Sequence, residues 1–442
     1  MPDQDLPHAH ASPRGGSSAI PAPRWGTTTG FAGSVAKLAS GQLIAMIVPI
    51  MAAPILGRLY DPSEYGVFAL YVAFATILAV FATLQFQHAI IAEKRERLAV
   101  QLVQLCAITA LTVAGFGLLF FGTITLLLSG QDKFSELRGW LFLLPFSMLL
   151  LGLMASIGAL ANRKARYGSM AAIQVLTALT TVLVAIMAGN AGWGASGLLA
   201  GYVSGQVAGA GSYLVLYRQL AAKTPRASLS RLIALSRRYR KFPIYTLPSE
   251  LLGIFNQQMP VLALSVLGAT ALTGSFSRAL QLVAAPITLI GMAVGQVFRQ
   301  KASADYRNHG TCQPLFRRTA LFLAAFGLPF SVVFSLFAPK IFSIYLGPDW
   351  REAGEVARWL APMLLLRLVS SPLSTVFFFA QAQRNDAAIM FAAFILCGTL
   401  VMSGAVMFTD PMAVIVGFSI AYSLIYLVQL VWSYRLARGT GR

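Results

Sequence analysis

Long apolar stretches, separated by short polar segments, dominate the pattern of hydrophobic and polar positions along the chain. Each stretch runs for roughly 20 residues or more, and at a rise of about 1.5 Å per residue a helix of that length crosses about 30 Å of hydrocarbon. The pattern predicts an all-α integral membrane protein with about twelve transmembrane helices. We expect them near residues 34–57, 66–91, 98–128, 140–161, 168–189, 195–217, 243–267, 273–298, 319–346, 354–381, 386–408 and 411–434.

The distribution of basic residues predicts which loops face the cytoplasm. In a soluble protein the formal net charge of +19 would suggest nucleic acid, but here 57% of residues are hydrophobic and only 11% are charged. Alternate loops carry most of the Lys and Arg side chains, and the positive-inside rule places those loops in the cytoplasm. They hold Lys94, Arg95, Arg97, Arg163, Lys164, Arg166, Arg218, Lys223, Arg226, Arg231, Arg237, Arg238, Arg240, Lys241, Arg299, Lys301, Arg307, Arg317 and Arg318, and Arg435, Arg438 and Arg442 follow the last helix. The opposite loops hold only Arg58, Lys133, Arg138, Arg351 and Arg358. We therefore expect a multi-pass protein of the bacterial inner membrane with both termini in the cytoplasm and no nucleic-acid partner.

The chain is expected to divide into two six-helix bundles around a central cavity. A weak internal repeat supports this division, because Gly66-Val67-Phe68 recurs as Gly274-Ser275-Phe276. Six helices per half give both halves the same orientation, so a substrate path would lie between them. The predicted parts are a disordered cytoplasmic tail without a signal-peptide core (1–33), an N-terminal bundle (34–217), a basic cytoplasmic linker (218–242), a C-terminal bundle (243–434) and a cytoplasmic tail (435–442).

Four ionisable side chains fall inside the predicted helices, where a charge is costly unless it faces a wet cavity or a partner. Lys37 lies in the first turns of helix one, and Arg278 lies in helix eight; either could belong to a functional site, or instead extend to the membrane interface. Glu250 in helix seven is a candidate for coupling transport to an ion, or for an ion pair with a basic residue. Arg367 lies in the middle of helix ten, where a structural ion pair and a link to the cavity are both open.

Uncharged polar side chains extend these positions into stripes. Gln281 follows Arg278 at three-residue spacing, on the same face of helix eight. Asn256, Gln257 and Gln258 lie beyond Glu250 in helix seven. We predict that all four contribute to a polar cavity within the bilayer.

Catalytic and cofactor chemistry finds little support in the sequence. The three cysteines, Cys106, Cys312 and Cys397, are scattered and offer no metal cluster or disulfide framework. No Gly-Lys dipeptide occurs, so the chain has no Walker A loop. We expect no catalytic residue, metal or cofactor, and transport would draw on gradients or on a partner.

Several segments resemble one family closely enough to suggest a function. Residues 54–68 (PILGRLYDPSEYGVF), 239–243 (YRKFP), 257–262 (QQMPVL) and 296–298 (QVF) resemble segments of the polysaccharide-repeat (O-antigen type) flippases of the multidrug/oligosaccharidyl-lipid/polysaccharide exporter (MOP) superfamily, in the same order. The resemblance implies two bundles around a V-shaped cavity, alternating access and a polyprenyl-pyrophosphate oligosaccharide as cargo. It also implies that basic cavity residues receive the anionic head, a role that Lys37 and Arg278 could fill here. Membrane lipids, a polymerase and glycosyltransferases of the same pathway are the partners it suggests.

Three rival functions remain open at this point. A cation-coupled drug exporter of the same superfamily would need an acidic cavity residue, and Glu250 keeps that reading available. A polysaccharide polymerase or ligase would need a sizeable outer loop, and the outer loops are expected to be too short to build a pocket. A membrane scaffold would not require Glu250 or Arg278 within the bilayer.

Overall fold

The computed structural model describes residues 41–127, 140–222, 224–225, 227–380, 382–407 and 410–439, and this part of the chain is helical with no β-strand. The first half contains α2 (Ala53–Leu59), α3 (Pro62–Ala82), α4 (Gln87–Ala92), α5 (Glu96–Leu127), α7 (Leu143–Arg163), α8 (Tyr167–Asn190), α9 (Ala195–Ala221) and α10 (Leu229–Arg238). The second contains η2 (Phe242–Thr246), α11 (Leu247–Val266), α12 (Thr270–His309), α13 (Gln313–Tyr345), η3 (Pro348–Trp350), α14 (Arg351–Leu373), α15 (Val376–Phe379), α16 (Gln383–Met407) and α17 (Met412–Ala437).

The prediction of an all-α membrane fold is confirmed. Ten helices are long and apolar enough to cross a membrane, the first of them running over Gly41–Leu59 and ending in α2. These ten do not include α9 and α11, which form at the places predicted for helices six and seven. Both have a reason for lower hydropathy, because α9 is rich in glycine and α11 carries the run Asn256-Gln257-Gln258.

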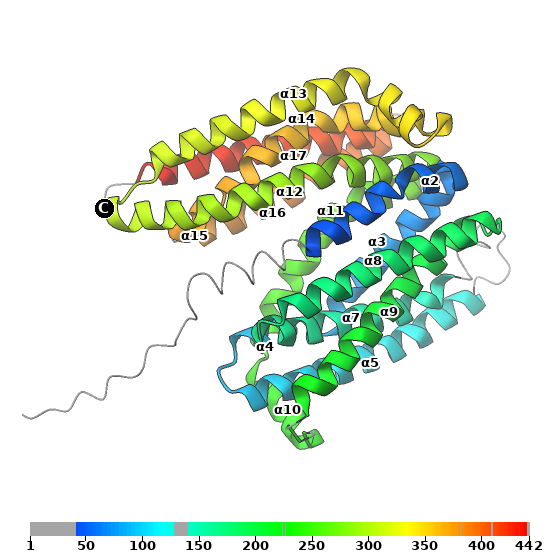
Figure 1. Cartoon of the computed structure of the whole chain (residues 1–442), viewed down its shortest axis with the longest axis vertical. Helices are drawn as coiled ribbons and strands as arrows, with labels where there is room; N and C mark the ends of the chain where they lie inside the picture. Colours follow the sequence, from blue (N-terminus) through cyan, green and yellow to red (C-terminus); the bar gives the residue numbers. More distant parts are fainter. Residues whose placement is uncertain are drawn as a thin grey trace, which may run out of the picture.

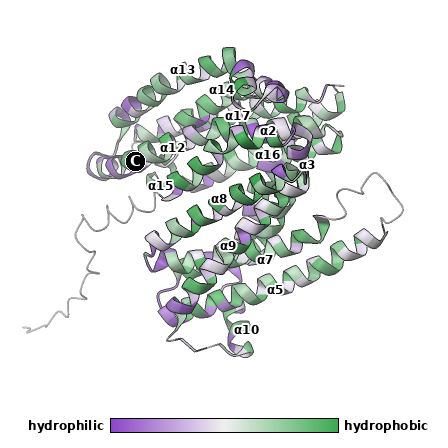
Figure 2. Cartoon of the chain, turned by 45° about the vertical axis from the view of Figure 1, so that its right-hand side comes forward, coloured by the Kyte–Doolittle hydropathy of each residue, from purple (hydrophilic) through white to green (hydrophobic). Residues whose placement is uncertain are grey.

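The helices form two groups, which Figure 1 shows converging at one end of the molecule and spreading apart at the other. One group contains α3, α5, α7, α8 and α9, and the other contains α12, α13, α14, α16 and α17. The largest apolar core lies in the second group and takes in Tyr65 and Ala69 of α3, so α3 joins the groups by packing against α12. Hydrophobic colour follows the lengths of the helices, while hydrophilic colour gathers toward their ends, as Figure 2 shows.

Close packing of α9 on α8 depends on glycines at four-residue spacing. A Cβ atom on Gly205 would lie 2.0 Å from the Thr181 hydroxyl oxygen, and one on Gly201 would lie 2.6 Å from the Thr181 carbonyl oxygen. Contacts this short leave room only for hydrogen, so the glycines let the two backbones approach. Gly197 and Gly209 belong to the same series, which therefore serves packing.

Several helix ends differ from the sequence expectation. The predicted helix 273–298 is longer in the structure, because α12 continues to His309 and includes Arg299, Lys301 and Arg307, which were expected in a loop. Residues 299–309 contain no Pro or Gly, and the helix ends where Gly310 adopts a left-handed φ of +69°. The predicted linker 218–242 likewise contains α10, whose Leu232 and Leu235 are buried against the first group of helices.

Candidate functional site

The two groups of helices are sealed together where α3 meets α12. A Cβ atom on Gly274 would lie 1.9 Å from the Pro62 carbonyl oxygen and 2.7 Å from the Gly66 nitrogen. A Cβ on Gly66 would lie 2.0 Å from the carbonyl oxygen of Thr270. The backbones therefore touch with no side chain between them, and we call this contact the seal.

A second set of contacts reinforces the seal from the turn between α13 and α14. Trp350 is fully buried, and its indole Nε1 donates a hydrogen bond of 2.8 Å to the Gly57 carbonyl oxygen at the end of the first helix. Tyr345 donates from its hydroxyl to the Ile50 carbonyl oxygen at 2.6 Å. Both bonds join the first helix to the second group, so the same end of the molecule is closed on two sides.

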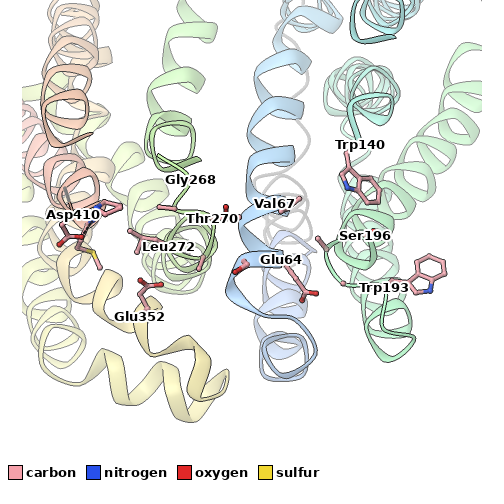
Figure 3. Close-up of a pocket in the computed structure, with 17 residues that line it drawn as sticks. Glu64, Val67, Trp140, Trp193, Ser196, Gly268, Thr270, Leu272, Glu352 and Asp410 are labelled. Carbon is pink, nitrogen blue, oxygen red and sulfur yellow. Dashed lines mark hydrogen bonds between the residues drawn. The ribbon is translucent and has the colours of Figure 1, made fainter. Parts of the chain in front are cut away.

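A cavity of about 1080 Å³, which we call the vestibule, lies on the seal and is drawn in Figure 3. Its charged lining residues are Glu64, Glu352 and Asp410, and no Lys, Arg or His is among its lining residues in the described part of the chain. The walls of the vestibule come from helix ends of both groups, and not from the loops that were expected to be too short to build a pocket. The lining residues at these helix ends include Ser63, Trp193, Ser196 and Thr270, and Figure 3 shows Glu64 between Thr270 on one side and Ser196 on the other.

Two of the vestibule carboxylates, Glu64 and Glu352, are held in place by hydrogen bonds. Asp61 caps α3 by accepting a hydrogen bond of 2.8 Å from the Glu64 backbone N–H, while the Glu64 side chain accepts one of 2.9 Å from the Asp61 N–H. Glu352 accepts a hydrogen bond of 3.2 Å from the Ser275 hydroxyl of α12. The vestibule is thus an acidic chamber above the seal.

Arg278 lies one turn of α12 beyond Ser275, on the other side of the seal from the vestibule, and only 3% of its surface is exposed. Its guanidinium carbon lies 4.8 Å from the centre of the Tyr65 ring, and its Nη1 donates a hydrogen bond of 2.9 Å to the Gln281 amide oxygen. Its Nε and Nη2 atoms are buried without a hydrogen-bond partner among the described residues. The predicted stripe of Arg278 and Gln281 is therefore a contact within α12, and in this state two guanidinium nitrogens are buried without a partner among the described residues.

The Tyr65 ring that contacts this arginine is itself packed against other aromatic rings. Tyr65 stands edge-on to Trp350 at 5.1 Å and to Tyr60 at 6.2 Å between ring centres, and its own hydroxyl is buried without a partner in the described chain. Aromatic faces attract cations, which accounts for the burial of a charge here. The sequence prediction missed Tyr65 and Trp350, although Tyr65 precedes Gly66 in the segment that carries the family resemblance.

The other predicted site residues are spread over α11 and α14. Gln258 donates a hydrogen bond of 3.3 Å to the Thr76 hydroxyl of α3, so it bridges the two groups near mid-helix. Asn256 is buried with an unpaired Oδ1, whereas Gln257 and Glu250 are exposed. Among the described residues neither Glu250 nor Arg367 forms a salt bridge. Lys37 lies outside the described residues.

Arg367 shares a smaller cavity with Arg299, which sequence reasoning had assigned to a loop. This cavity of about 300 Å³ lies between α12 and α14, where Gly291 and Gly295 face Pro372. Its polar lining is Thr288, Gln296, Ser371 and Thr375, and none of its lining residues is acidic. Two guanidinium groups without a carboxylate make it a second candidate for binding an anion.

Comparisons with known proteins agree with this architecture. Residues 55–355 match the model of a family described as polysaccharide biosynthesis protein. The chain belongs to this family. A search of curated proteins finds no match.

The fold of this member of the polysaccharide biosynthesis family is similar to the folds of several solved structures. The inward closed conformation of the lipid II flippase MurJ matches with a TM-score of 0.71 and 13% identity, over 90% of this chain and 87% of that one. A multidrug resistance MATE family transporter of the MOP superfamily matches in its inward-facing conformation with a TM-score of 0.68 and 15% identity, over 91% of this chain and 98% of that one. An outward-facing MATE conformation gives 0.53, also at 15% identity, over 91% and 95%. The chain is thus a member of the polysaccharide biosynthesis family, and its helical membrane fold is similar to the folds of these transporters.

Proposed function

We propose that this protein moves a polyprenyl-pyrophosphate-linked oligosaccharide from the cytoplasmic to the periplasmic leaflet of the bacterial inner membrane, by alternating access. Membership of a polysaccharide biosynthesis family supports the pathway. The observation that carries the proposal is Arg278, a buried arginine with two unpaired donors at the junction of the two groups of helices. The product would serve surface polysaccharide synthesis.

Arg278 has the chemistry that a diphosphate requires. A buried donor without a partner costs about 1–3 kcal/mol, so the unliganded protein holds the two nitrogens at a disadvantage. Phosphate oxygens can accept from a guanidinium in pairs, with a geometry that lysine does not offer. Binding of a diphosphate would satisfy these donors, and Gln281 would hold the guanidinium in place through its bond to Nη1.

The charges that line the two cavities have opposite signs, which favours movement of an anion in one direction along the molecule. The cavity of Arg299 and Arg367 is basic and lies along the α12 residues 287–299, away from the vestibule, whereas the vestibule is acidic. From Thr270 to Arg299 is about 29 residues of helix, or roughly 44 Å. We propose that the anionic head meets the arginine cavity first and Arg278 next, and leaves through the vestibule, whose carboxylates disfavour its retention.

The proposed orientation follows the basic residues. Basic residues of the first group form contacts at the end away from the vestibule. Arg163 donates a hydrogen bond of 3.0 Å to the Lys94 carbonyl oxygen, and Lys164 donates one of 2.9 Å to the Leu220 carbonyl oxygen. The positive-inside rule puts this end in the cytoplasm, with both chain termini. Since the groups converge at the vestibule and spread apart at the other end, the state seen here would be inward-facing, in keeping with the higher TM-scores to inward structures.

The membrane potential can supply the driving force without a nucleotide. An inside-negative potential favours outward movement of anions by about 2.3 kcal/mol per charge per 100 mV, so two charges would gain about 4–5 kcal/mol. Transport in vesicles that proceeds equally well after the potential is collapsed would refute this coupling. Glu250 remains the predicted alternative for coupling to a cation, and a Glu250→Gln protein with unchanged transport would exclude it.

The test is an assay of lipid-linked oligosaccharide in cells that lack the protein. We expect intermediates to accumulate in the cytoplasmic leaflet, and the wild type and Arg307→Ala to clear them. Arg307 is an exposed arginine on the same helix, so it is a matched control for Arg278→Ala, which we expect to fail. If nothing accumulates and susceptibility to cationic drugs rises instead, the protein is a drug exporter and the proposal is wrong.

A further inference from the structure

A third basic cavity, separate from the proposed substrate path, lies between the start of α13 and the end of α17. Its volume is about 410 Å³. Both helices contribute apolar residues and arginines to its lining, with one arginine on α13 and two on α17. The apolar residues are Phe316, Ala320, Leu321, Leu430 and Val431, and the basic ones are Arg317, Arg435 and Arg438, with Tyr434 beside them.

The order of these residues along the helices fits a lipid. On α13 Phe316 and Arg317 come first and Ala320 and Leu321 follow toward the middle of the helix, while on α17 the apolar residues come first and the arginines follow at the end. The basic groups therefore gather at one level and the apolar surface runs from there toward the membrane interior. Leu321 is 67% exposed and Val431 is 51% exposed, so the groove faces outward where an acyl chain can lie.

The head of this groove is built and held before any ligand binds. Tyr434 accepts hydrogen bonds from Gln313 Nε2 at 2.9 Å and from Arg438 Nη2 at 3.3 Å, and the Arg438 guanidinium lies 4.6 Å from the centre of the Tyr434 ring. The Ala437 carbonyl oxygen accepts from the Cys312 backbone N–H at 2.9 Å and from the Thr311 hydroxyl at 2.8 Å. These bonds fix the end of α17 against α13, so the arginines sit on a rigid frame.

No carboxylate balances the three arginines. No acidic residue lines the cavity, and within the described residues none of Arg317, Arg435 and Arg438 forms a salt bridge. Basic pockets between helices on the cytoplasmic side of a membrane protein are suited to acidic lipid head groups. We propose that this groove binds an anionic phospholipid of the cytoplasmic leaflet, with its phosphate among the three arginines and an acyl chain along Leu321 and Val431.

The experiment is native mass spectrometry of the full-length protein released from detergent, with phosphatidylglycerol or cardiolipin as the probe and phosphatidylethanolamine for comparison. Each arginine near a membrane surface contributes roughly fivefold to the binding of an acidic lipid. We expect Arg435→Gln to weaken cardiolipin binding roughly fivefold and the triple variant Arg317→Gln, Arg435→Gln, Arg438→Gln to weaken it roughly a hundredfold. Phosphatidylethanolamine binding should not change.

The control is the triple variant Arg231→Gln, Arg237→Gln, Arg240→Gln, which removes the same charge from α10 and the residues that follow it. Equal weakening of cardiolipin binding by both triple variants would refute a specific groove, because net charge alone would then explain the effect. Because Arg438 also contacts Tyr434, the exposed Arg435 is tested singly, and an unchanged affinity in that folded protein would also refute the proposal.

A soluble phosphate is the other source of the same chemistry. The competitor is inorganic pyrophosphate at about 1 mM, the usual upper range for metabolite affinities. If it displaces cardiolipin as effectively as cardiolipin itself does, the groove is not a lipid site. Resistance to pyrophosphate supports the phospholipid.

Discussion

Gly66 of α3 and Gly274 of α12 lie against each other where the two groups of helices meet, so closely that a Cβ atom on Gly274 would come within 2.7 Å of the Gly66 nitrogen. The two residues occupy matching places in the internal repeat, each opening a Gly-x-Phe segment. Neither backbone can retreat without separating α3 from α12. Closure of the vestibule end therefore depends on the absence of a Cβ atom at both residues.

Enlarging Gly274 should open this end. In Gly274→Val the new side chain would meet the Pro62 carbonyl oxygen, a backbone atom that cannot move aside alone, so we predict a shift toward a state with a wider vestibule. Spin labels on Ser196→Cys and Asp410→Cys, two lining residues of the vestibule, would measure the change as a longer distance. The native cysteines are buried and should not react.

Gly211→Ala on α9 is the control for this prediction, because nothing lies within 4 Å of a Cβ atom there. It should leave the distance distribution unchanged. A Gly274→Val protein with the wild-type distribution would mean that the seal does not govern closure.

Arg278 should be costly for stability and necessary for transport. Its unpaired donors are a penalty of about 1–3 kcal/mol each, which the contact with Tyr65 offsets by up to about 2 kcal/mol. We predict that Arg278→Met melts at the same temperature as the wild type or higher, while transport falls at least about tenfold. A variant that loses stability in proportion to transport would show that the arginine is only structural.

The sequence predicted that Arg278 and Gln281 share one face of a helix because of their three-residue spacing, and the structure adds the hydrogen bond between them. It also predicted the helical fold, since twelve apolar stretches have few alternatives in a membrane. Tyr65, Trp350 and Glu352 could not be found in this way, because their contacts with α12 and the first helix join residues far apart in the chain. The extension of α12 past Arg299 was missed because hydropathy marks where a helix leaves the membrane and not where it ends.

The arginine cavity between α12 and α14 gives a separate prediction for substrate capture. Neutralising both groups in Arg299→Gln, Arg367→Gln should weaken binding of farnesyl diphosphate, a short isoprenoid diphosphate, by at least about tenfold, because each removes a charge-assisted contact. Isothermal titration in detergent would measure this, with Arg307→Gln as the control on the same helix. Unchanged affinity would exclude the cavity from the substrate path.

Docking of α10 should depend on the ionisation of Glu93. The pKa of Glu93 lies below its ordinary value, first because Tyr239 donates a hydrogen bond to the carboxylate and then because the Arg95 backbone N–H does so. A carboxylate with a lowered pKa stabilises the docked state at every pH above its ordinary value near 4.5, and the contribution is lost as the pH falls through the lowered one. We predict faster hydrogen exchange of α10 in acid, and in Glu93→Gln already at pH 7.

Glu355→Gln supplies the comparison for Glu93, because Glu355 forms its salt bridge to Arg358 at 2.9 Å within α14 and not at α10. Hydrogen exchange of α10 in the Glu355→Gln protein should match that in the wild type. Equal protection of α10 in all three proteins would show that Glu93 and Tyr239 do not hold the helix.

The most direct test of the central claim is to reconstitute the purified protein in vesicles and to follow a fluorescent polyprenyl-diphosphate disaccharide from one leaflet to the other. With an imposed potential, negative on the side of the basic loops, the wild type and Arg307→Gln should move it out of that leaflet at the same rate, and Arg278→Gln should be at least about tenfold slower. Equal rates in the wild type, in Arg278→Gln and in vesicles without protein would contradict the account.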